Sequence, residues 1–466
     1  MPSRRRSRCG DIAGSRIAAA RAAVAAMVAA CVMLPAGLAT ASSGFELRSQ
    51  SASTLGSAQA GMTCGVADVS TIAFNPAALA YGTGTEAAIG VTGLFTSVKF
   101  SETAAATTII GTPIPGNQGG DAGTRVAIPN AFIGAALVDD VRIGLAITPR
   151  FGLGSYWSNG WVGRYYALNS QFRTIDIVPT LSWRPTSQLS LGVGVDVQYA
   201  KVKTTSAIDF GTIDQVLTGG AFGGIPAGSD GSTASEADSW GVGFTLGVIY
   251  EPQPGMRLGF DYHSKIHQQL SGDAKFYVGG PVGAGIALVT GAFRDTSLTA
   301  DLDLPAMAAA GIYYEINADW AVMADIKWID WSSFSVLQVD FGNPAQPPVQ
   351  TSYRWRDSWF AAVGARYRVN EAMALRFGVA YDQSPTRNDT RNPVIPDTQS
   401  VWVAVGLEYR FSPQLKGDLA YGHIFARDGP IDLSATTPDN TFRGNLSGNI
   451  QGSRVDYLAV QLAYRF

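Results

Sequence analysis

The sequence predicts a transmembrane antiparallel β-barrel of about 14 strands, with an N-terminal segment that plugs its lumen. Apolar residues alternate with small or polar ones at period two, aromatic residues collect at the ends of the apolar faces, and short connections alternate with long ones. Only 15% of the 466 residues are charged. A helical membrane protein needs several apolar runs of roughly 20 residues, whereas this chain has a single one, at its N-terminus.

That apolar run has the features of an export signal. Residues 1–41 combine a basic start, an apolar stretch over 22–34 and the small-residue cleavage site Ala39-Thr40-Ala41, so the mature chain is expected to begin at Ser42. Val28-Ala29-Ala30-Cys31 allows a lipoprotein signal as the alternative. The residues after Cys31 stay apolar, however, where a mature lipoprotein usually turns polar. The basic start contains Arg4, Arg5, Arg6, Arg8, Arg16 and Arg21.

Cleavage of this signal changes the cysteine content and the charge of the chain. It removes Cys9 and Cys31, which leaves Cys64 without a partner for an internal disulfide. It also removes six arginines and one aspartate from 34 basic and 37 acidic residues, so the mature chain carries a net charge of −8. No basic run remains in the mature sequence, which argues against a nucleic-acid partner.

The strands are placed from the alternation. In 401–411, in 189–200 and in 457–466, one set of alternate positions is apolar and the other is mostly small, polar or charged. The full set has an even number of strands, as a closed single-chain barrel requires. The strands are predicted at 87–100, 126–138, 141–152, 171–184, 188–204, 238–251, 256–266, 297–316, 319–341, 351–369, 372–384, 398–412, 415–428 and 452–466.

A soluble β-sandwich shows the same alternation, so other features decide between the two folds. Aromatic residues end the apolar faces, as an interfacial girdle requires, and the chain ends in the aromatic strand Tyr464-Arg465-Phe466. Connections after even-numbered strands are tight, whereas those after odd-numbered strands are mostly long. A sandwich has no reason to sort its loops in this way, so a barrel over 87–466 is predicted, with short periplasmic turns. The girdle residues are Tyr199, Tyr250, Tyr262, Tyr314, Trp328, Tyr367, Tyr381 and Tyr409.

The stretch 42–86, before the first strand, has a different character. It is rich in serine and glycine and contains the turn-prone run Asn75-Pro76-Ala77-Ala78. A flexible periplasmic tail would share this composition. The apolar residues within it indicate instead that it packs against the nearest available surface, the barrel lumen, and acts as a plug. These residues are Phe45, Leu47, Leu55, Ile72, Phe74 and Leu79.

Several short motifs carry a resemblance to a known family. Near the N-terminus they are Gly44-Phe45-Glu46-Leu47, Leu55-Gly56 and Phe74-Asn75-Pro76-Ala77. Later ones are Trp161-Val162-Gly163-Arg164-Tyr165-Tyr166-Ala167, Asp330-Trp331-Ser332-Ser333-Phe334, Ile395-Pro396-Asp397-Thr398, Tyr409-Arg410-Phe411-Ser412-Pro413 and Asp418-Leu419-Ala420-Tyr421. In this order and spacing, they make the mature chain resemble the FadL/TodX (OMPP1) family of outer-membrane transporters for long-chain fatty acids and hydrocarbons.

The resemblance implies a fourteen-stranded barrel with an N-terminal hatch, a pocket beside the hatch, a hydrophobic groove among the outer loops and an inward kink of the third strand that opens the wall. The pocket residues are then expected to be Phe45, Leu47, Leu55, Phe74, Asn75 and Pro76. The apolar residues of two long loops are the groove candidates, since exposed apolar side chains in long loops often mark a binding site. They are Phe210, Leu217, Phe222, Phe276, Tyr277 and Phe293.

Two further sets of residues follow from the predicted strands. Strand parity turns Arg354, Arg356 and Lys265 toward the lumen, where they are candidates to bind a carboxylate or to pair with lumen acids. Pro149 is expected to interrupt the hydrogen bonding of the third strand, where Gly152 lies three residues further on. Pro179 is expected to do the same in the fourth strand. Two weakened neighbours would place a lateral opening at that seam.

These expectations describe passive uptake of fatty acids or similar hydrophobic molecules, without cofactor, metal or catalysis. The alternatives are a TodX-like importer of aromatic hydrocarbons and, less favoured because of the plug, a general porin. A hydrolase is disfavoured, because the chain has only His263, His267 and His423 and no Gly-x-Ser-x-Gly motif. The expected location is the outer membrane of a Gram-negative cell. The expected partners are its lipid and lipopolysaccharide, the barrel-assembly machinery and a hydrophobic ligand, and the protein is expected to be a monomer.

Overall fold

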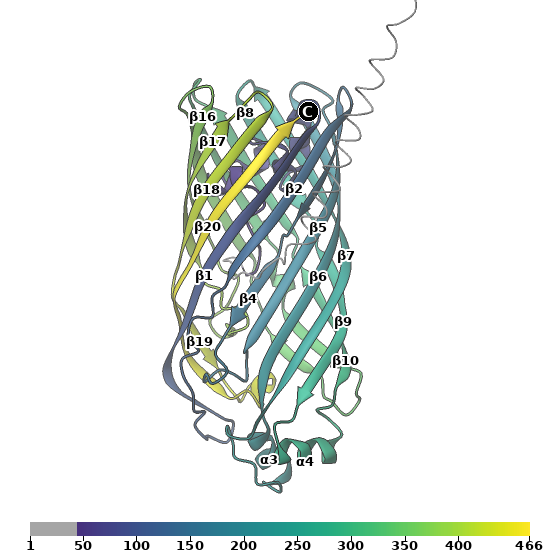
Figure 1. Cartoon of the computed structure of the whole chain (residues 1–466), viewed down its shortest axis with the longest axis vertical. Coiled ribbons are helices and arrows are strands. Elements are labelled where there is room, and N and C mark those ends of the chain that lie inside the picture. Colours follow the sequence, from purple (N-terminus) through teal and green to yellow (C-terminus); the bar gives the residue numbers. More distant parts are fainter. Residues whose placement is uncertain (1–43) are drawn as a thin grey trace, which may run out of the picture.

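The protein is a closed β-barrel, described here over residues 44–466 by a computed structural model; the predicted signal peptide lies outside these residues. The barrel has 14 antiparallel strands and closes through the pairing of the first with the last (Figure 1). Eight strands are continuous: β1 (Glu86–Thr107), β2 (Arg125–Val138), β5 (Asn169–Trp183), β6 (Leu189–Asp209), β7 (Asp230–Gln253), β16 (Met373–Asp382), β17 (Ser400–Arg410) and β20 (Asn445–Arg465).

The other strands each consist of two pieces with a short irregular link. The pairs are β3 (Val141–Thr148) with β4 (Gly152–Tyr156), β8 (Met256–His263) with β9 (Ile266–Tyr277), β10 (Thr296–Leu304) with β11 (Met307–Glu315), β12 (Trp320–Ile329) with β13 (Val336–Phe341), β14 (Val349–Ser352) with β15 (Ser358–Arg368), and β18 (Leu415–Ala426) with β19 (Gly429–Leu433). Tight turns lie at the end of the barrel that holds the C-terminus. The long loops with α3 (Phe210–Thr218) and α4 (Pro281–Thr290) lie at the other end (Figure 1).

The outer face of the barrel is apolar, as the alternation predicts. On β20, Leu458 and Val460 are 48% and 46% exposed, whereas Ala459 and Gln461 are 0% and 1% exposed. The large apolar residues therefore point toward lipid, and the small and polar ones point into the lumen. Within residues 44–466, no helix combines the length and the apolar character needed to span a membrane.

Several strands extend further outward than the alternation predicts. β7 begins at Asp230 rather than at 238, and β1 continues to Thr107 rather than to 100. The β7 extension pairs with β6 without a gap, as far as Asp209 with Asp230, and the β1 extension pairs with β20 through β-bulges. They lie beyond the apolar band, where both faces of a strand are polar and the period-two signal disappears, so the sequence pattern could not reveal them.

The N-terminal segment, residues 44–85, is folded inside the barrel near the end with the tight turns (Figure 1). It forms α2 (Ala52–Leu55) and three short 3-10 helices, η1 (Met62–Cys64), η2 (Val69–Ala73) and η3 (Pro76–Tyr81). Each of these elements packs against a different part of the wall: α2 against β17, β18 and β20, η1 against β8 and β11, η2 against β1, β2 and β3, and η3 against β3, β5, β6 and β7.

Buried polar groups attach this segment to the wall. The carboxylate of Asp325 on β12 accepts hydrogen bonds from the backbone N–H groups of Gly61 and Thr63 and, at 2.6 Å, from the Thr63 hydroxyl. Asn75 accepts from Ala77 N–H and donates to the backbone carbonyls of Thr63 and of two wall residues, Val248 and Phe260. Gly247 permits this close approach, because a Cβ there would lie 2.0 Å from the Asn75 Oδ1.

Replacing Asp325 by alanine should loosen the segment without opening the barrel. The three donors that now bond to Asp325 would be left buried without an acceptor, at a local cost of about 3 kcal/mol. Hydrogen exchange measured by mass spectrometry should accelerate over residues 61–65 and stay unchanged in β16 and β17. Asp319→Ala, in an exposed turn where the carboxylate is 61% exposed, is the matched control. Unchanged exchange over 61–65 would show that Asp325 does not hold the segment.

Candidate functional site

The barrel wall is interrupted beside its third strand. β3 ends at Thr148 and β4 begins at Gly152, so the strand breaks where the sequence has Pro149. β2 pairs with β3 only as far as Ala131 with Ile147, and the next backbone bond across the seam runs from Tyr156 N–H to Ala122 O, at 3.1 Å. Between these points β4 pairs only with β5. We call the unpaired stretch, with edges 123–130 and 148–155, the wall break.

One edge of the wall break lies inside the barrel. Residues 148–155 are all buried, whereas a strand within the wall alternates between exposed and buried positions. Gly152 allows the Leu47 side chain to come close, since a Cβ at Gly152 would lie 2.9 Å from Leu47 Cδ1. The strand is therefore displaced inward at this point and packs on the N-terminal segment.

Residues 45–50 of the N-terminal segment bond to both edges of the wall break. They occupy donors and acceptors that a continuous strand ladder would otherwise use, as backbone groups at membrane depth must find partners. On the inward edge, Gly152 N–H donates to Phe45 O at 2.9 Å, Leu47 N–H donates to Arg150 O at 2.8 Å, and the Gln50 amide donates to Pro149 O at 3.2 Å; on the β2 edge, the Asn130 amide donates to Ser49 O at 2.9 Å.

An aromatic cluster surrounds Phe45 on the outer side of the segment. The Phe45 ring, 3% exposed, contacts five other rings. The centroid distances are 4.7 Å to Trp331, 5.2 Å to Phe172, 5.6 Å to Phe334 and 5.8 Å to both Phe151 and Trp355. Gly44, at φ +73°, has no room for a side chain, because its Cβ would lie 2.8 Å from Trp355. The cluster brings together aromatic residues from the N-terminal segment and from four separate stretches of the barrel.

Buried charges lie directly behind this cluster. The Lys327 ammonium pairs with Glu46, and Arg48 pairs with Glu46 at 3.0 Å and with Asp382 at 3.3 Å. Arg150, on the inward edge of the wall break, pairs with Asp196 at 3.0 Å. A cavity of about 20 Å³ lies among them, lined also by Phe74, Met62, Asp261 and His263. Charges this deeply buried are expensive unless paired, and each of these three cations has a buried carboxylate partner.

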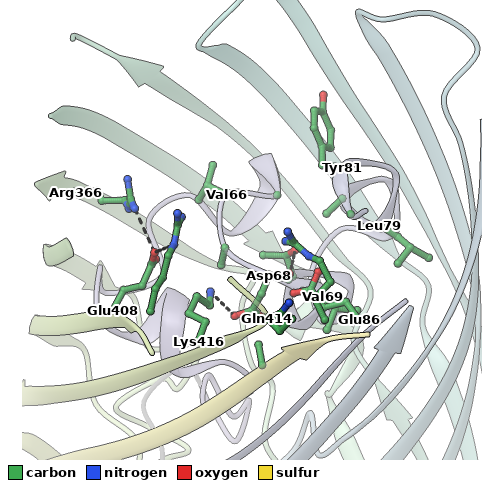
Figure 2. Close-up of a pocket in the computed structure, with 18 of the residues that line it drawn as sticks. Val66, Asp68, Val69, Leu79, Tyr81, Glu86, Arg366, Glu408, Gln414 and Lys416 are labelled. Atoms are coloured by element: carbon green, nitrogen blue, oxygen red, sulfur yellow. Dashed lines mark hydrogen bonds and ion pairs between the residues drawn. The ribbon is translucent and has the colours of Figure 1, made fainter. Parts of the chain in front are cut away.

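A second and larger cavity opens at the periplasmic end. It has a volume of about 570 Å³ and a lining rich in charged residues (Figure 2). Asp68 of the N-terminal segment pairs with Lys416 at 2.7 Å, and Arg366 pairs with Glu408 at 3.3 Å (Figure 2). Burial opposes ionisation of Asp68, but the Lys416 ammonium outweighs it and lowers the pKa of that carboxyl to about 2. The cavity suits water and ions rather than a hydrocarbon.

The six residues predicted to line the hatch pocket are all buried, yet they do not share one cavity. Phe45 lies in the aromatic cluster, and Phe74 borders the small charged cavity. Leu47 packs on Gly152, and Leu55 faces Gly422 on the other side of the lumen. Asn75 and Pro76 pack on Gly247 and Gly192 and hold the segment to the wall.

The six residues predicted for the outer groove fall into two groups. Phe210, Phe222, Phe276 and Phe293 form a small core that joins α3 and α4 to the barrel rim; the rings of Phe210 and Phe293 lie 4.9 Å apart. Leu217 and Tyr277 remain 56% and 69% exposed. Val216, Ile225, Leu288 and Val289 are exposed beside them, so the apolar surface of the two-helix unit extends beyond the predicted residues.

The predicted inward orientation of Arg354, Arg356 and Lys265 is wrong. Arg354 is 58% exposed and pairs with Asp389 at 2.8 Å, while its neighbours Tyr353 and Trp355 point inward. Lys265 is 41% exposed and pairs with Asp303 at 3.3 Å. The wrong orientations of all three residues have one physical cause. Residues 353–357 and 264–265 are irregular links between strand pieces, and the alternation of inward and outward positions does not continue across such a link. Arg354 even adopts φ +46°.

The predicted interruption at Pro179 is confirmed only in the pairing with β6, which stops at Ile177 with Val197 and resumes in the same register at Thr180 with Gly194. β5 itself is continuous, and Pro179 still pairs with Leu145 of β3, so the seam between the third and fourth strands is not weakened there. The ring points outward, and its missing N–H leaves the course of the strand unchanged. The wall break therefore lies in the seam between β2 and β4.

The buried cations Arg48, Arg150 and Lys327 were missed by sequence reasoning. The inward position of Lys327 could have been predicted from the sequence, because β12 alternates without a break from Trp320 and its odd-numbered residues after Val322 point inward. The buried position of Arg150 could not, because residues 148–155 are all buried and do not alternate. Within residues 44–466, no group of histidine, cysteine and acidic residues could hold a metal ion.

Comparison with known proteins assigns the chain to a family. The model of the outer membrane protein transport family (OMPP1/FadL/TodX) matches residues 32–466. The chain belongs to this family. Its fold is also that of a solved FadL homologue from Pseudomonas aeruginosa, with a TM-score of 0.83 and 28% identity over 91% of this chain and 100% of the other.

Three further similar proteins are outer-membrane proteins or transporters. Outer membrane protein P1 of Haemophilus influenzae is 28% identical over 85% of this chain and 89% of its own length. A long-chain fatty acid transport protein of Escherichia coli is 27% identical over 64% of this chain and 69% of its own length. The toluene transporter TodX of Pseudomonas putida shares the fold, with a TM-score of 0.65 and 20% identity. The chain is therefore an outer-membrane transporter of the hydrophobic-molecule type.

Acid should release the attachment at Asp68. Its folded pKa of about 2 lies below the ordinary 3.8, so the pair stabilises the folded state above about pH 4 and its contribution is lost as the pH falls through 2. Pepsin should leave residues 66–74 intact at pH 4 and cut them near pH 2. Asp68→Asn should permit cleavage already at pH 4, and Asp319→Asn should not. Equal resistance of Asp68→Asn and the unmodified chain at pH 4 would contradict the attachment.

Proposed function

We propose that this protein is a passive outer-membrane channel for long-chain fatty acids or closely similar amphipathic molecules, with the wall break as the exit and residues 45–50 as its gate. The observation that carries the proposal is the position of these residues, which bond to both edges of an interrupted wall. A gate of this kind needs no energy source, because the ligand follows its own partition into the membrane.

The relatives support a fatty acid as the cargo. The proteins that are 27% to 28% identical to this chain include one named for long-chain fatty acid transport and one described as a FadL homologue. The toluene transporters are about 20% identical and support only the common fold. We therefore place the fatty acid first and an aromatic hydrocarbon second.

The proposed path begins at the outer loops. The exposed apolar surface of α3, α4 and the end of β9, including Leu217 and Tyr277, is the first contact for a hydrophobic molecule. The acyl chain then enters the aromatic cluster around Phe45 and displaces rings that now pack on one another. Displacement of Phe45 strains the hydrogen bond from Gly152 N–H to the Phe45 carbonyl oxygen. Arrival of the ligand is thereby coupled to opening of the gate.

The buried cations behind the cluster are the proposed carboxylate site. Lys327, Arg150 and Arg48 converge on the small charged cavity, and Glu46 lies between Lys327 and Arg48. A carboxylate that replaced Glu46 would keep these cations paired while it freed the gate residue Glu46.

Neutralising the Lys327–Glu46 pair tests the cargo. Lys327→Met combined with Glu46→Gln removes one cation and leaves no uncompensated charge, so the dissociation constant for oleate should rise about tenfold. Uptake of toluene or an alkane should not change, because an uncharged ligand needs no cation. The exposed pair Lys265→Met with Asp303→Asn serves as the control. Unchanged oleate affinity in the Lys327→Met, Glu46→Gln variant would show that the oleate carboxylate does not bind at Lys327.

A reversible lock tests the gate. Ser49→Cys with Asn130→Cys, in a Cys64→Ser background, places two thiols where the Asn130 amide now donates to Ser49 O at 2.9 Å. Oxidation should stop oleate uptake, and dithiothreitol should restore it. Each single-cysteine variant should transport under both conditions. Full uptake by the cross-linked protein, with the cross-link verified by mass spectrometry, would exclude 45–50 as the gate.

A general porin is the weaker alternative. It would need an open aqueous lumen, whereas residues 44–81 are largely buried across the barrel, held at Asp325, Asn75 and Asp68. Steady conductance for small ions in planar bilayers would favour the porin. Brief conductance that appears only with oleate would fit the gated channel.

A further inference from the structure

The outward charges that lie just beyond the apolar band are unevenly distributed around the barrel. On β5 the apolar outward residues extend from Trp183 to Ile175, and the next outward residue is Arg173. On β6 they extend from Leu189 to Tyr199, and the next two outward residues are Lys201 and Lys203. On the other side of the wall break, the first outward cations are Arg125 on β2, Lys99 on β1 and Arg454 on β20. We call these six residues the basic sector.

The strand register brings these cations close together. Arg173 lies directly opposite Lys201 in the β5–β6 ladder. Arg125 pairs with Phe95, Arg454 pairs with Ser97, and Lys99 follows two residues later on the same strand. Like charges directly opposite each other destabilise a sheet, and of this pair only Lys201 has a carboxylate partner, Glu236 on β7.

Most acids near the basic sector are already engaged, although Asp238 lies opposite Lys201 in the β6–β7 ladder. Glu236 is shared between Lys201 and Lys203, at 2.5 and 2.8 Å. Asp121, beside Lys99, accepts from the Ser97 hydroxyl and from the backbone of Val98 and Gly123. Asp456, beside Arg454, accepts from Tyr421 and His423. Within residues 44–466, the structure gives Arg125, Arg173 and Arg454 no carboxylate at salt-bridge distance.

The neighbouring outward surface has the opposite balance. The strands β7, β9 and β10 and the link before β9 present mainly acids beyond the apolar band. They carry Asp238, Asp273, Asp301 and Asp303 against Lys265 and Lys275. The excess of cations therefore does not extend onto the adjacent strands β7, β9 and β10.

We propose that the basic sector binds the phosphate groups of lipopolysaccharide in the outer leaflet, on both sides of the wall break. The cations point toward lipid rather than into the lumen, and they begin where the apolar band ends, which is the level of lipid head groups. Clusters of lysine and arginine at this level bind anionic head groups, and arginine forks match phosphate oxygens. Bound lipid would thus line the membrane side of the seam.

Lipid A binding to the purified full chain tests this proposal. Native mass spectrometry compares bisphosphorylated lipid A with the same lipid A after phosphatase treatment. The unmodified protein should prefer the phosphorylated form by about tenfold or more. The variant with Arg125→Gln, Arg173→Gln, Lys201→Gln and Arg454→Gln should lose this preference. Lys265→Gln with Lys275→Gln, on the adjacent acidic surface, should retain it.

Three results would overturn the proposal: equal binding of the two lipid forms, an equal loss in the control variant, or displacement of lipid A by excess oleate. The last would mean that the sector holds the carboxylate of a departing ligand. Heat-dependent mobility on gels verifies that each barrel is folded. If the fourfold variant does not assemble, Arg173→Gln and Arg125→Gln alone should each reduce the preference about threefold, and no reduction in either would count against the site.

Discussion

The structure depends on the backbone bonds between the N-terminal segment and the interrupted third strand. A barrel in a membrane must satisfy every backbone N–H and C=O group internally, because lipid offers no partner. Between β2 and β4 the ladder is missing, and Phe45 and Leu47 provide the bonds to Gly152 and Arg150 that hold the inward strand in place. The plug and the wall are thus one hydrogen-bonded unit, and movement of either affects the other.

The attachments of the N-terminal segment are unequal, which limits what can move. Residues 61–75 are tied to the wall by the buried Asp325 carboxylate and the Asn75 amide, with further support at Asp68. Residues 45–50 are held by single backbone and amide bonds, by aromatic packing around Phe45, and by the ion pairs of Glu46 with Lys327 and of Arg48 with Asp382. A ligand that enters the aromatic cluster and whose carboxylate replaces Glu46 acts on these residues and leaves 61–75 attached. A local opening at the wall break therefore needs far less energy than removal of the whole plug.

The sequence predicted the barrel well because its outer face is a repeated physical pattern. Outward residues on all strands meet the same lipid, so the apolar alternation, the aromatic ends and the sorted loops each report the fold independently. The resemblance through Phe45 and Asn75 pointed to the N-terminal segment, and Pro149 pointed to the third strand. The cations were misplaced where strands are interrupted, because Arg354 and Lys265 lie in irregular links that parity cannot cross. The buried pairing of Lys327 with Glu46 is a contact between distant segments, and no local pattern encodes it.

The exit route is the central claim, and photo-crosslinking during uptake tests it most directly. A fatty acid that carries a diazirine at its far end would be supplied to cells that make the protein, and its adducts would be mapped by mass spectrometry. The account predicts adducts on the β2 edge of the wall break, at Ala127 and Pro129, and their loss when residues 45–50 are cross-linked. Adducts on Arg142 and Glu86, in the periplasmic cavity, with none on the β2 edge, would contradict it.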